Sequence, residues 1–223
     1  MTTVLITDDQ PLQRLGFRML LESQDDMTVV GEASNGIEAV RMTAELHPDV
    51  ALMDVRMPGL DGIEATRRIV TTGHRTRVLI LTTFDLDEYA YAGLRAGASG
   101  FLIKDAQPEE LLSGIRSVAT GDAVVAPALT RRLLDAYAEH LPTPTSDTAP
   151  AAMDPRLTAL TDREREILTV VGKGWTNLEI SARLHLAEST VKTHIGRILA
   201  KTGSRDRIQA VILAYDTNLV QPS

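Results

Sequence analysis

Apolar residues follow two alternating spacings from the start of the chain to about residue 120. Short runs rich in aliphatic and β-branched residues, typical of buried strands, alternate with longer segments whose apolar residues recur at helical spacing. The expected strands span residues 3–7, 27–33, 49–54, 77–83 and 99–103. The expected helices span residues 11–23, 35–46, 61–70, 87–97 and 108–121. The alternation predicts an α/β domain, a doubly wound, five-stranded parallel sheet with helices on both faces.

Beyond this domain the pattern changes twice. Residues 127–141 have the spacing of one more amphipathic helix, and residues 142–155 hold four prolines among Ser, Thr and Ala, a composition typical of a linker. We therefore expect one domain at 1–121, a linker at 122–155 that includes the helix at about 127–141, and a second domain at 156–223.

The second domain has a purely helical pattern. Four segments with tight breaks between them predict a small all-α, four-helix domain, at residues 161–174, 176–186, 187–203 and 204–220. Thr161 and Glu164 form the sequence signature of a capping box. The second and third segments have helix-turn-helix spacing, with a turn at His185 to Glu188.

Charge distinguishes the two parts of the chain. Residues 1–154 carry 13 Lys and Arg against 23 Asp and Glu, a balance of -10, and residues 155–223 carry 10 against 7, a balance of +3. Only the second part suits a polyanion such as DNA. With no cysteine, no visible targeting signal and no apolar run near the roughly 18 residues that span a bilayer, we expect a cytoplasmic protein without membrane contact.

Carboxylates and partner groups follow the expected strands. Asp8 and Asp9 come after the first expected strand, and Asp54 ends the third. In a flavodoxin-like strand order the first and third strands are neighbours, so these residues are expected to lie close together. Thr82 ends the fourth strand and Lys104 follows the fifth. Three converging carboxylates suit Mg²⁺, and a hydroxyl and an ammonium beside them suit a phosphoryl group carried by Asp54.

Each of these residues also has a plainer interpretation. Asp8 and Asp9 precede Pro11 and could act only at a helix N-terminus, Lys104 could be a solvated lysine, and Thr82 an ordinary strand residue. Their joint placement at strand ends favours the phosphoryl site.

The outer face of the third C-terminal helix is polar and basic. Apolar residues such as Val191 and Ile198 take its core positions, which leaves Lys192, Thr193, Gly196 and Arg197 facing outward, where a major groove would be read. Ser189 and Thr190 lie at its positive N-terminus and suit a phosphate.

The segments "TDDQP", "LMDVRMPGLDG", "ILTTFD" and "GASGFLIKD" resemble the receiver domain of bacterial two-component response regulators. The resemblance covers residues 3 to about 120. It implies that a histidine kinase phosphorylates Asp54 and that Mg²⁺ is held by Asp9, Asp54 and the Arg56 backbone carbonyl, with Asp8 acting through water. It also implies that Thr82 and Lys104 bind the phosphoryl oxygens and that Phe101 turns inward as Thr82 moves. Asp105 stands where many receivers have proline.

The segments "LTDREREIL", "GKGWTNLEISARL", "STVKTHIGRILAK" and "RDRIQAVILAY" resemble the LuxR-type DNA-binding domain over about 157–220. Together the two domains resemble the NarL/FixJ subfamily. The resemblance implies DNA contacts by Lys192, Thr193, His194, Arg197, Thr176, Asn177 and Arg205. It further implies a homodimer on activation, with contacts around Ala210 to Ala214 in the last helix, bound to double-stranded DNA. Trp175 replaces a small aliphatic residue of the family and is expected to pack rather than read bases.

The expected function is a phosphorylation-controlled transcription regulator and not an enzyme. One alternative is an aspartyl-phosphate phosphohydrolase, but such enzymes place a second acid where this chain has Arg56. Another alternative is a DNA-binding protein that is regulated by a ligand and independent of phosphorylation. The presence of Asp8, Asp9, Asp54, Thr82 and Lys104 together disfavours it.

Overall fold

The computed structural model describes residues 1–73, 75–82, 86–121 and 154–220. The chain divides into two compact units, Met1–Ala126 and Pro127–Ser223, each with its own buried core. The predicted helix at 127–141 lies outside the described residues, as does most of the predicted linker. The boundaries at both ends of that linker therefore stay predictions.

The first unit contains the predicted parallel sheet. Its strands are β1 (Thr2–Thr7), β2 (Met27–Ala33), β3 (Val50–Asp54), β4 (Arg77–Thr82) and β5 (Gly100–Ile103). They pair in parallel in the order β2-β1-β3-β4-β5, which confirms the flavodoxin-like order. β1 and β3 are thus neighbours, as the grouping of the acidic residues requires.

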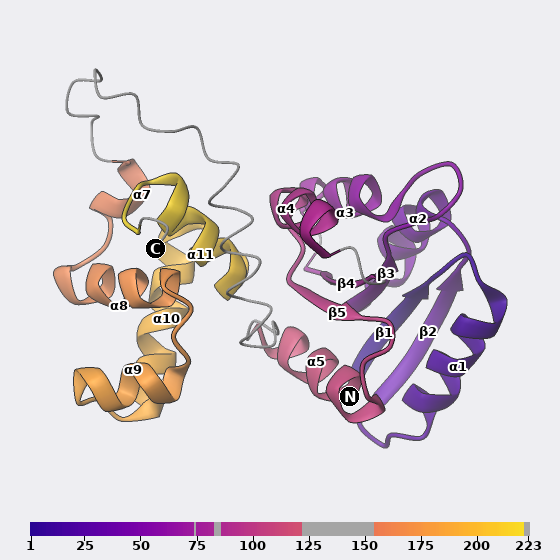
Figure 1. The fold of residues 1–223 in the computed structure, drawn as a ribbon, viewed down its shortest axis with the longest axis horizontal. Coiled ribbons are helices and arrows are strands. Elements are labelled where there is room, and N and C mark those ends of the chain that lie inside the picture. Colours follow the sequence, from indigo (N-terminus) through magenta and orange to yellow (C-terminus); the bar gives the residue numbers. More distant parts are fainter. Residues whose placement is uncertain (74, 83–85, 122–153, 221–223) are drawn as a thin grey trace. The chain divides into compact units, whose positions relative to one another are not determined.

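Helices cover both faces of this sheet. They are α1 (Pro11–Glu22), α2 (Gly36–Leu46), α3 (Gly62–Thr71), α4 (Leu86–Ala96) and α5 (Pro108–Thr120). α1 and α5 lie on one face, and α2, α3 and α4 lie on the other (Figure 1). Proline at the first position of α1 and α5 has its ring preset for a helix, and Gly121 ends α5 with φ 85°.

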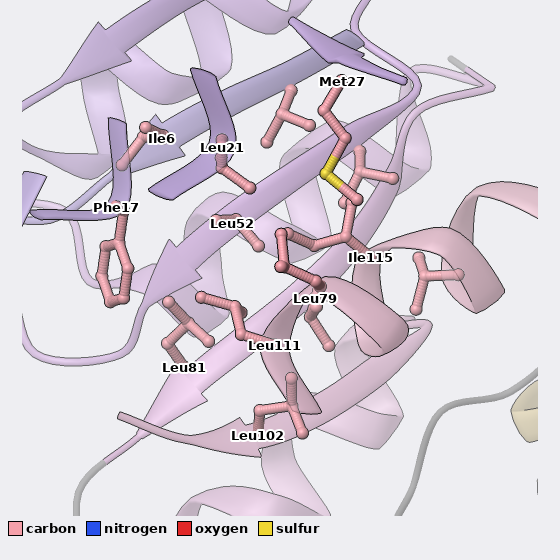
Figure 2. Close-up of a cluster of buried hydrophobic side chains, with 14 residues drawn as sticks. Ile6, Phe17, Leu21, Met27, Leu52, Leu79, Leu81, Leu102, Leu111 and Ile115 are labelled. Carbon is pink, nitrogen blue, oxygen red and sulfur yellow. The ribbon is translucent and has the colours of Figure 1, made fainter. Parts of the chain in front are cut away.

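The face under α1 and α5 holds a continuous apolar core. Figure 2 shows its side chains, which alternate along the strands because successive residues point to opposite faces. Val50 and Leu52 of β3 point into this core, as do Phe17 of α1 and Ile115 of α5. Burial of apolar surface stabilises a fold by roughly 25 cal/mol per Å². This core therefore fixes the strands, and with them the positions of the strand ends.

The second unit is entirely helical in its described part. Its helices are α7 (Pro155–Thr158), α8 (Asp162–Gly172), α9 (Asn177–Leu184), α10 (Glu188–Thr202) and α11 (Arg207–Asp216). Each of the four predicted helices contains an observed one. The capping box at Thr161 and Glu164 is present as predicted, and Thr176 with Glu179 forms a second one that the sequence analysis did not anticipate.

One short helix was not predicted. The sequence pattern gave no helix between the linker and residue 161, and Pro155 is the first residue of α7. The Asp154 side chain accepts a hydrogen bond from the Arg156 N–H, and proline is favoured at a first helical position. A cap and a proline thus support a turn too short for periodicity to reveal. In the part of the chain that the structure describes, no helix is long and apolar enough to cross a membrane.

Candidate functional site

Asp54 ends the buried strand β3 in the stretch "PDVALMDVRMPGLDG", residues 48–62. The chain returns to it at Gly62, the first residue of α3, whose N–H donates to the Val55 carbonyl at 2.9 Å. A Cβ atom at position 62 would lie 1.9 Å from the Asp54 carbonyl oxygen. Only glycine permits this approach, so the loop between the two residues closes tightly over the end of β3.

Three carboxylates meet at this end of the sheet. One oxygen from each of Asp8, Asp9 and Asp54 lies within 4.8 Å of the others. Asp8 and Asp54 are buried, whereas Asp9 is exposed. The grouping predicted from the strand ends is therefore present in the fold.

Lys104 places its ammonium between the two buried carboxylates. Its Nζ lies 2.7 Å from Oδ2 of Asp8 and 2.9 Å from Oδ2 of Asp54. The side chain of Lys104 is 5% exposed, so it is not a solvated surface lysine. Removal of one partner from such a buried group leaves an uncompensated charge and is strongly destabilising.

Burial and neighbouring charges shift two of these groups. Burial raises the pKa of the Asp54 carboxyl above its ordinary value, and the hydrogen bond from Lys104 opposes that shift only in part. Burial by itself would lower the pKa of Lys104, but hydrogen bonds to Asp8 and Asp54 outweigh it and raise the pKa. The ammonium is therefore held charged beside a carboxylate whose negative charge is costly.

Thr82 and Phe101 lie on the neighbouring strands. Thr82 is buried at the end of β4, and its backbone carbonyl accepts a hydrogen bond of 2.8 Å from the Lys104 N–H. Phe101 is 1% exposed and packs against α4, where a Cβ atom at Gly93 would lie 2.7 Å from its ring. The ring thus already occupies the inward position that the resemblance associates with activation.

The donor set fits Mg²⁺. Carboxylate oxygens are the ligands this ion prefers, and three carboxylates meet here while Lys104 supplies only one positive charge among them. Arg56 lies beside them, with its N–H 3.4 Å from Oδ1 of Asp54. Arg56 and Asp9 line an open pocket, together with Tyr89 from α4.

Two supporting residues were missed from the sequence. Gly62 carries no chemistry, and only the close approach to Asp54 in the folded chain reveals its role. Arg14 lies on α1 and donates a hydrogen bond of 2.7 Å to the Asp8 backbone carbonyl. An arginine on an amphipathic helix does not reveal from the sequence that it bonds to Asp8, because that contact depends on how the helix packs beside the strand.

The predicted outer face of α10 is exposed. Lys192, Thr193, Gly196 and Arg197 all lie on it, with Ser189 at its start, whereas Val191 and Ile198 are buried. Thr190 and His194 are half-buried, and the Thr193 hydroxyl donates to the Ser189 carbonyl at 2.9 Å. Of the residues on α10 predicted to contact DNA, Ser189, Lys192, Thr193 and Arg197 are therefore exposed, and Thr190 and His194 are exposed only in part.

The start of α9 is held by contacts within the second unit. The Thr176 side chain caps the helix, and the Asn177 side-chain oxygen accepts a hydrogen bond of 2.8 Å from Arg207. Arg207 also donates to the Trp175 carbonyl, and the Arg183 guanidinium lies 5.0 Å from the centre of the Trp175 ring. Trp175 therefore packs, as expected. Arg205 is half-buried, which limits its reach as a DNA contact.

The segment Ala210–Ala214, expected to form a dimer contact, is buried within the chain. Each of its side chains is between 0 and 8% exposed. A dimer through this helix would require those side chains to be uncovered first.

Comparison with known proteins gives two family matches. Residues 4–116 match the response regulator receiver domain, and residues 158–214 match the bacterial regulatory proteins of the luxR family. The chain is 42% identical to the transcriptional regulatory protein YxjL of Bacillus subtilis over 98% of this chain and 97% of that protein. It is 38% identical to the transcriptional regulatory protein LiaR of Bacillus subtilis, over 99% and 100% of the two chains.

A solved structure extends the likeness to the fold. The crystal structure of the response regulator ChrA, from a heme-sensing two-component system, is 34% identical and covers 98% of each chain with a TM-score of 0.51.

Proposed function

This chain belongs to the response regulators that join a receiver domain to a LuxR-type DNA-binding domain, and we propose that phosphorylation of Asp54 controls its regulation of transcription. The observation that carries the proposal is the buried arrangement of Asp8, Asp54 and Lys104 at one end of the sheet. It holds one carboxylate rigidly and supplies a charge that can meet a phosphoryl group.

The chemical step is a phosphoryl transfer. An oxygen of the Asp54 carboxylate attacks the phosphorus of a phosphohistidine on a histidine kinase, and the P–N bond breaks with its electron pair left on the imidazole nitrogen. The product is an aspartyl phosphate, with more negative charge than the carboxylate had. Lys104 lies close enough to Asp54 to compensate that charge, and Thr82 supplies a hydroxyl from the adjacent strand.

Mg²⁺ would be held by Asp9, Asp54 and the Arg56 carbonyl, with Asp8 assisting, and would neutralise charge on the phosphoryl oxygens. The chain's own residues keep the acceptor in place. Gly62 lets the loop close over the Asp54 backbone, and Lys104 fixes the carboxylates of Asp8 and Asp54. Because the acceptor site is already ordered, the binding energy of the phosphodonor is not needed to order it.

The output is a shift in population between receiver states. Thr82 moves toward the phosphoryl group, and the inward position that Phe101 already holds in this structure is stabilised further, which changes the surface formed by α4 and β5. That surface then favours a homodimer, and two copies of α10 bind double-stranded DNA in adjacent major grooves. Such binding to kinase and DNA would take place in the cytoplasm.

Two other functions are less well supported. A phosphohydrolase of the aspartyl-phosphate type needs a second acid two residues after its nucleophile, and Arg56 stands there. A ligand-regulated DNA-binding protein has no need for a buried ammonium between two carboxylates, an arrangement that is costly to build. A long-lived phosphate on a switch, with at most slow loss, fits the site better than turnover.

The test is phosphorylation with acetyl phosphate and Mg²⁺. Intact-mass measurement, gel filtration and DNA retention are compared for the wild type, Asp54→Asn and the matched control Asp105→Asn, an exposed carboxylate next to Lys104. We expect the wild type and the control to gain one phosphoryl group, to dimerise and to retain DNA. A wild type that gains no phosphoryl mass, or an Asp54→Asn variant that gains it equally, would contradict the proposal.

A further inference from the structure

The loop between β1 and α1 carries two of the three clustered carboxylates, so its shape decides where they point. Within the loop, Oδ1 of Asp8 accepts a hydrogen bond of 2.8 Å from the Gln10 N–H. That bond ties Asp8 only to its own loop. Three contacts reach outside it. The Asp8 N–H donates to the Ala33 carbonyl of β2 at 3.2 Å, and Lys104 donates to the Asp8 carboxylate at 2.7 Å. In the third, the Arg14 guanidinium donates to the Asp8 backbone carbonyl at 2.7 Å.

Arg14 is itself anchored on a different strand. Its Nε donates to Oε2 of Glu32 at 3.2 Å, and Glu32 lies on β2 opposite Ile6 of β1. The Arg14 side chain is 16% exposed, so its position is well defined by its surroundings. The Arg14 guanidinium therefore connects the sheet to the loop, because its Nε donates to Glu32 of β2 and its Nη1 donates to the Asp8 carbonyl.

Arg18 makes an informative comparison. It lies one turn further along α1 and also pairs with Glu32, but its other partner is Glu22 on the same helix. Arg14 donates to the Asp8 carbonyl, whereas Arg18 donates to Glu32 and Glu22. The two arginines thus share a charge, a helix and an anchor, and differ in the link to the acidic loop.

We propose that Arg14 is a positioning residue of the acidic site, because it ties the Asp8 carbonyl to Glu32 and so keeps the carboxylates of Asp8 and Asp9 turned toward Asp54. The inference rests on the proposed role of these carboxylates in holding Mg²⁺. Mutual repulsion pushes such carboxylates apart, and Mg²⁺ tolerates little deviation from octahedral geometry. Residues that orient ligands in this way typically change metal affinity when they are removed.

The test measures Mg²⁺ binding by isothermal titration calorimetry on the full chain, without any phosphodonor. Arg14→Gln is expected to bind Mg²⁺ about tenfold more weakly than the wild type, the lower end of the effect of such ligand-orienting residues. Arg18→Gln, the matched control, is expected to stay within about twofold of the wild type. Equal Mg²⁺ affinity for the wild type and Arg14→Gln overturns the inference, as does an equal loss in both arginine variants.

A second pair of variants separates position from charge. Glu32→Gln keeps the Arg14 charge but weakens its anchor, so we expect weaker Mg²⁺ binding. Loss of a negative charge near the site also weakens cation binding, so this variant is compared with Glu22→Gln, which removes the same charge from a partner of Arg18. Arg14→Lys keeps the charge but lacks a planar fork to reach both partners, and it should recover little of the affinity. Equal Mg²⁺ affinity for Glu32→Gln and Glu22→Gln, or full recovery by Arg14→Lys, would show that charge alone acts.

The outcome is distinguishable from failure of the proposed function. If the wild type binds Mg²⁺ with the expected dependence on Arg14 but acetyl phosphate leaves Asp54 unmodified, the positioning role stands and the switch fails. If Asp54 is phosphorylated and Mg²⁺ affinity is indifferent to Arg14, the switch stands and the positioning role fails. Thermal unfolding of each variant verifies that the binding measurements are made on folded protein.

Discussion

The acidic end of the receiver sheet and the outer face of α10 are built in opposite ways. At the acidic end, Asp8, Asp54 and Lys104 are buried and bonded to one another. On α10, Lys192 and Arg197 are exposed. A site that must meet charge developing at one atom benefits from being preassembled, since no reorganisation is then needed during the reaction. A surface that binds along a polyanion such as DNA needs long, exposed side chains. Its binding free energy comes from many phosphate contacts, each of which releases counterions.

The largest expected effect is on the acidic end. Lys104→Met should lower the free energy of unfolding of the receiver unit by about 3 kcal/mol at neutral pH, because two buried carboxylates lose their cation. Urea denaturation followed by hydrogen exchange and mass spectrometry reads that unit separately from the other.

A surface ion pair in the same unit provides the control for Lys104. Arg116 pairs with Asp26 at 2.7 Å, but its side chain is 44% exposed, and Arg116→Met should destabilise the unit far less than Lys104→Met. Adding Asp8→Asn to Lys104→Met should recover part of the loss. Equal costs for the two single variants would mean that burial does not distinguish these pairs.

The next effect tests the closed loop at Asp54. Gly62→Ala should destabilise the receiver unit by about 2 kcal/mol and slow phosphorylation by acetyl phosphate, since the new methyl group meets the Asp54 carbonyl. The matched control is Gly16→Ala in α1, where a Cβ atom has nothing within 4 Å. That change should stabilise by about 0.5 kcal/mol. Retained stability in Gly62→Ala would show that the loop is looser than its geometry indicates.

A smaller effect is expected for a partly buried ion pair in the second unit. The hydrogen bond from Lys201, at 2.6 Å, lowers the pKa of Glu164 to about 2. Because this value is below the ordinary one, the stabilisation is fully present above about pH 4.5 and is lost as the pH falls toward 2. Glu164→Gln, which still fits a capping box, should therefore cost about 1 kcal/mol at pH 7 and progressively less in acid.

Fluorescence of Trp175, the one tryptophan of the chain, follows unfolding of this unit. Glu166→Gln is the control, since Glu166 pairs with Arg163 at the surface and should change stability by less than about 0.5 kcal/mol at either pH. A stability difference between the wild type and Glu164→Gln that persists unchanged at pH 2 would contradict the assignment.

The smallest effect is expected on the exposed face. Lys192→Ala should weaken binding to double-stranded DNA and reduce the slope of log affinity against log salt by about 0.9, the contribution of one phosphate contact. Fluorescence anisotropy over a salt series measures it, with Lys173→Ala as a control because Lys173 is exposed at the end of α8. An unchanged slope would remove Lys192 from the DNA contacts, and stability should be unaffected in both variants.

Sequence periodicity was sufficient to predict the alternation of strands and helices and a parallel sheet. The grouping of Asp8, Asp54 and Lys104 at one edge also required a recognised flavodoxin-like strand order, and the receiver was identified from its motifs. Periodicity could not show that the Lys104 ammonium bridges the two carboxylates. The roles of Gly62 and Arg14 depend on chain segments meeting in space, which no local pattern encodes.

The second unit was predicted less completely, for two physical reasons. Helix α7 has only 4 residues, less than the pattern needs to repeat. Polar residues near a helix start also serve two purposes, and Thr176 and Asn177, predicted to contact DNA, are used in a cap and in a bond to Arg207. Their contact with DNA stays a prediction, as does that of the exposed residues of α10.

Phe101 packs against Gly93, and on the proposed mechanism this contact would make the strength of the response adjustable at a distance from Asp54. A methyl group at position 93 would compete with the ring for the same space, with 2.7 Å to the ring and 2.8 Å to the Ile80 side chain. On the proposed mechanism, it would push the ring outward and raise the free energy of the phosphorylated state without changing the acceptor. Asp54 would then receive the signal, and the size of residue 93 would set how strongly the receiver responds.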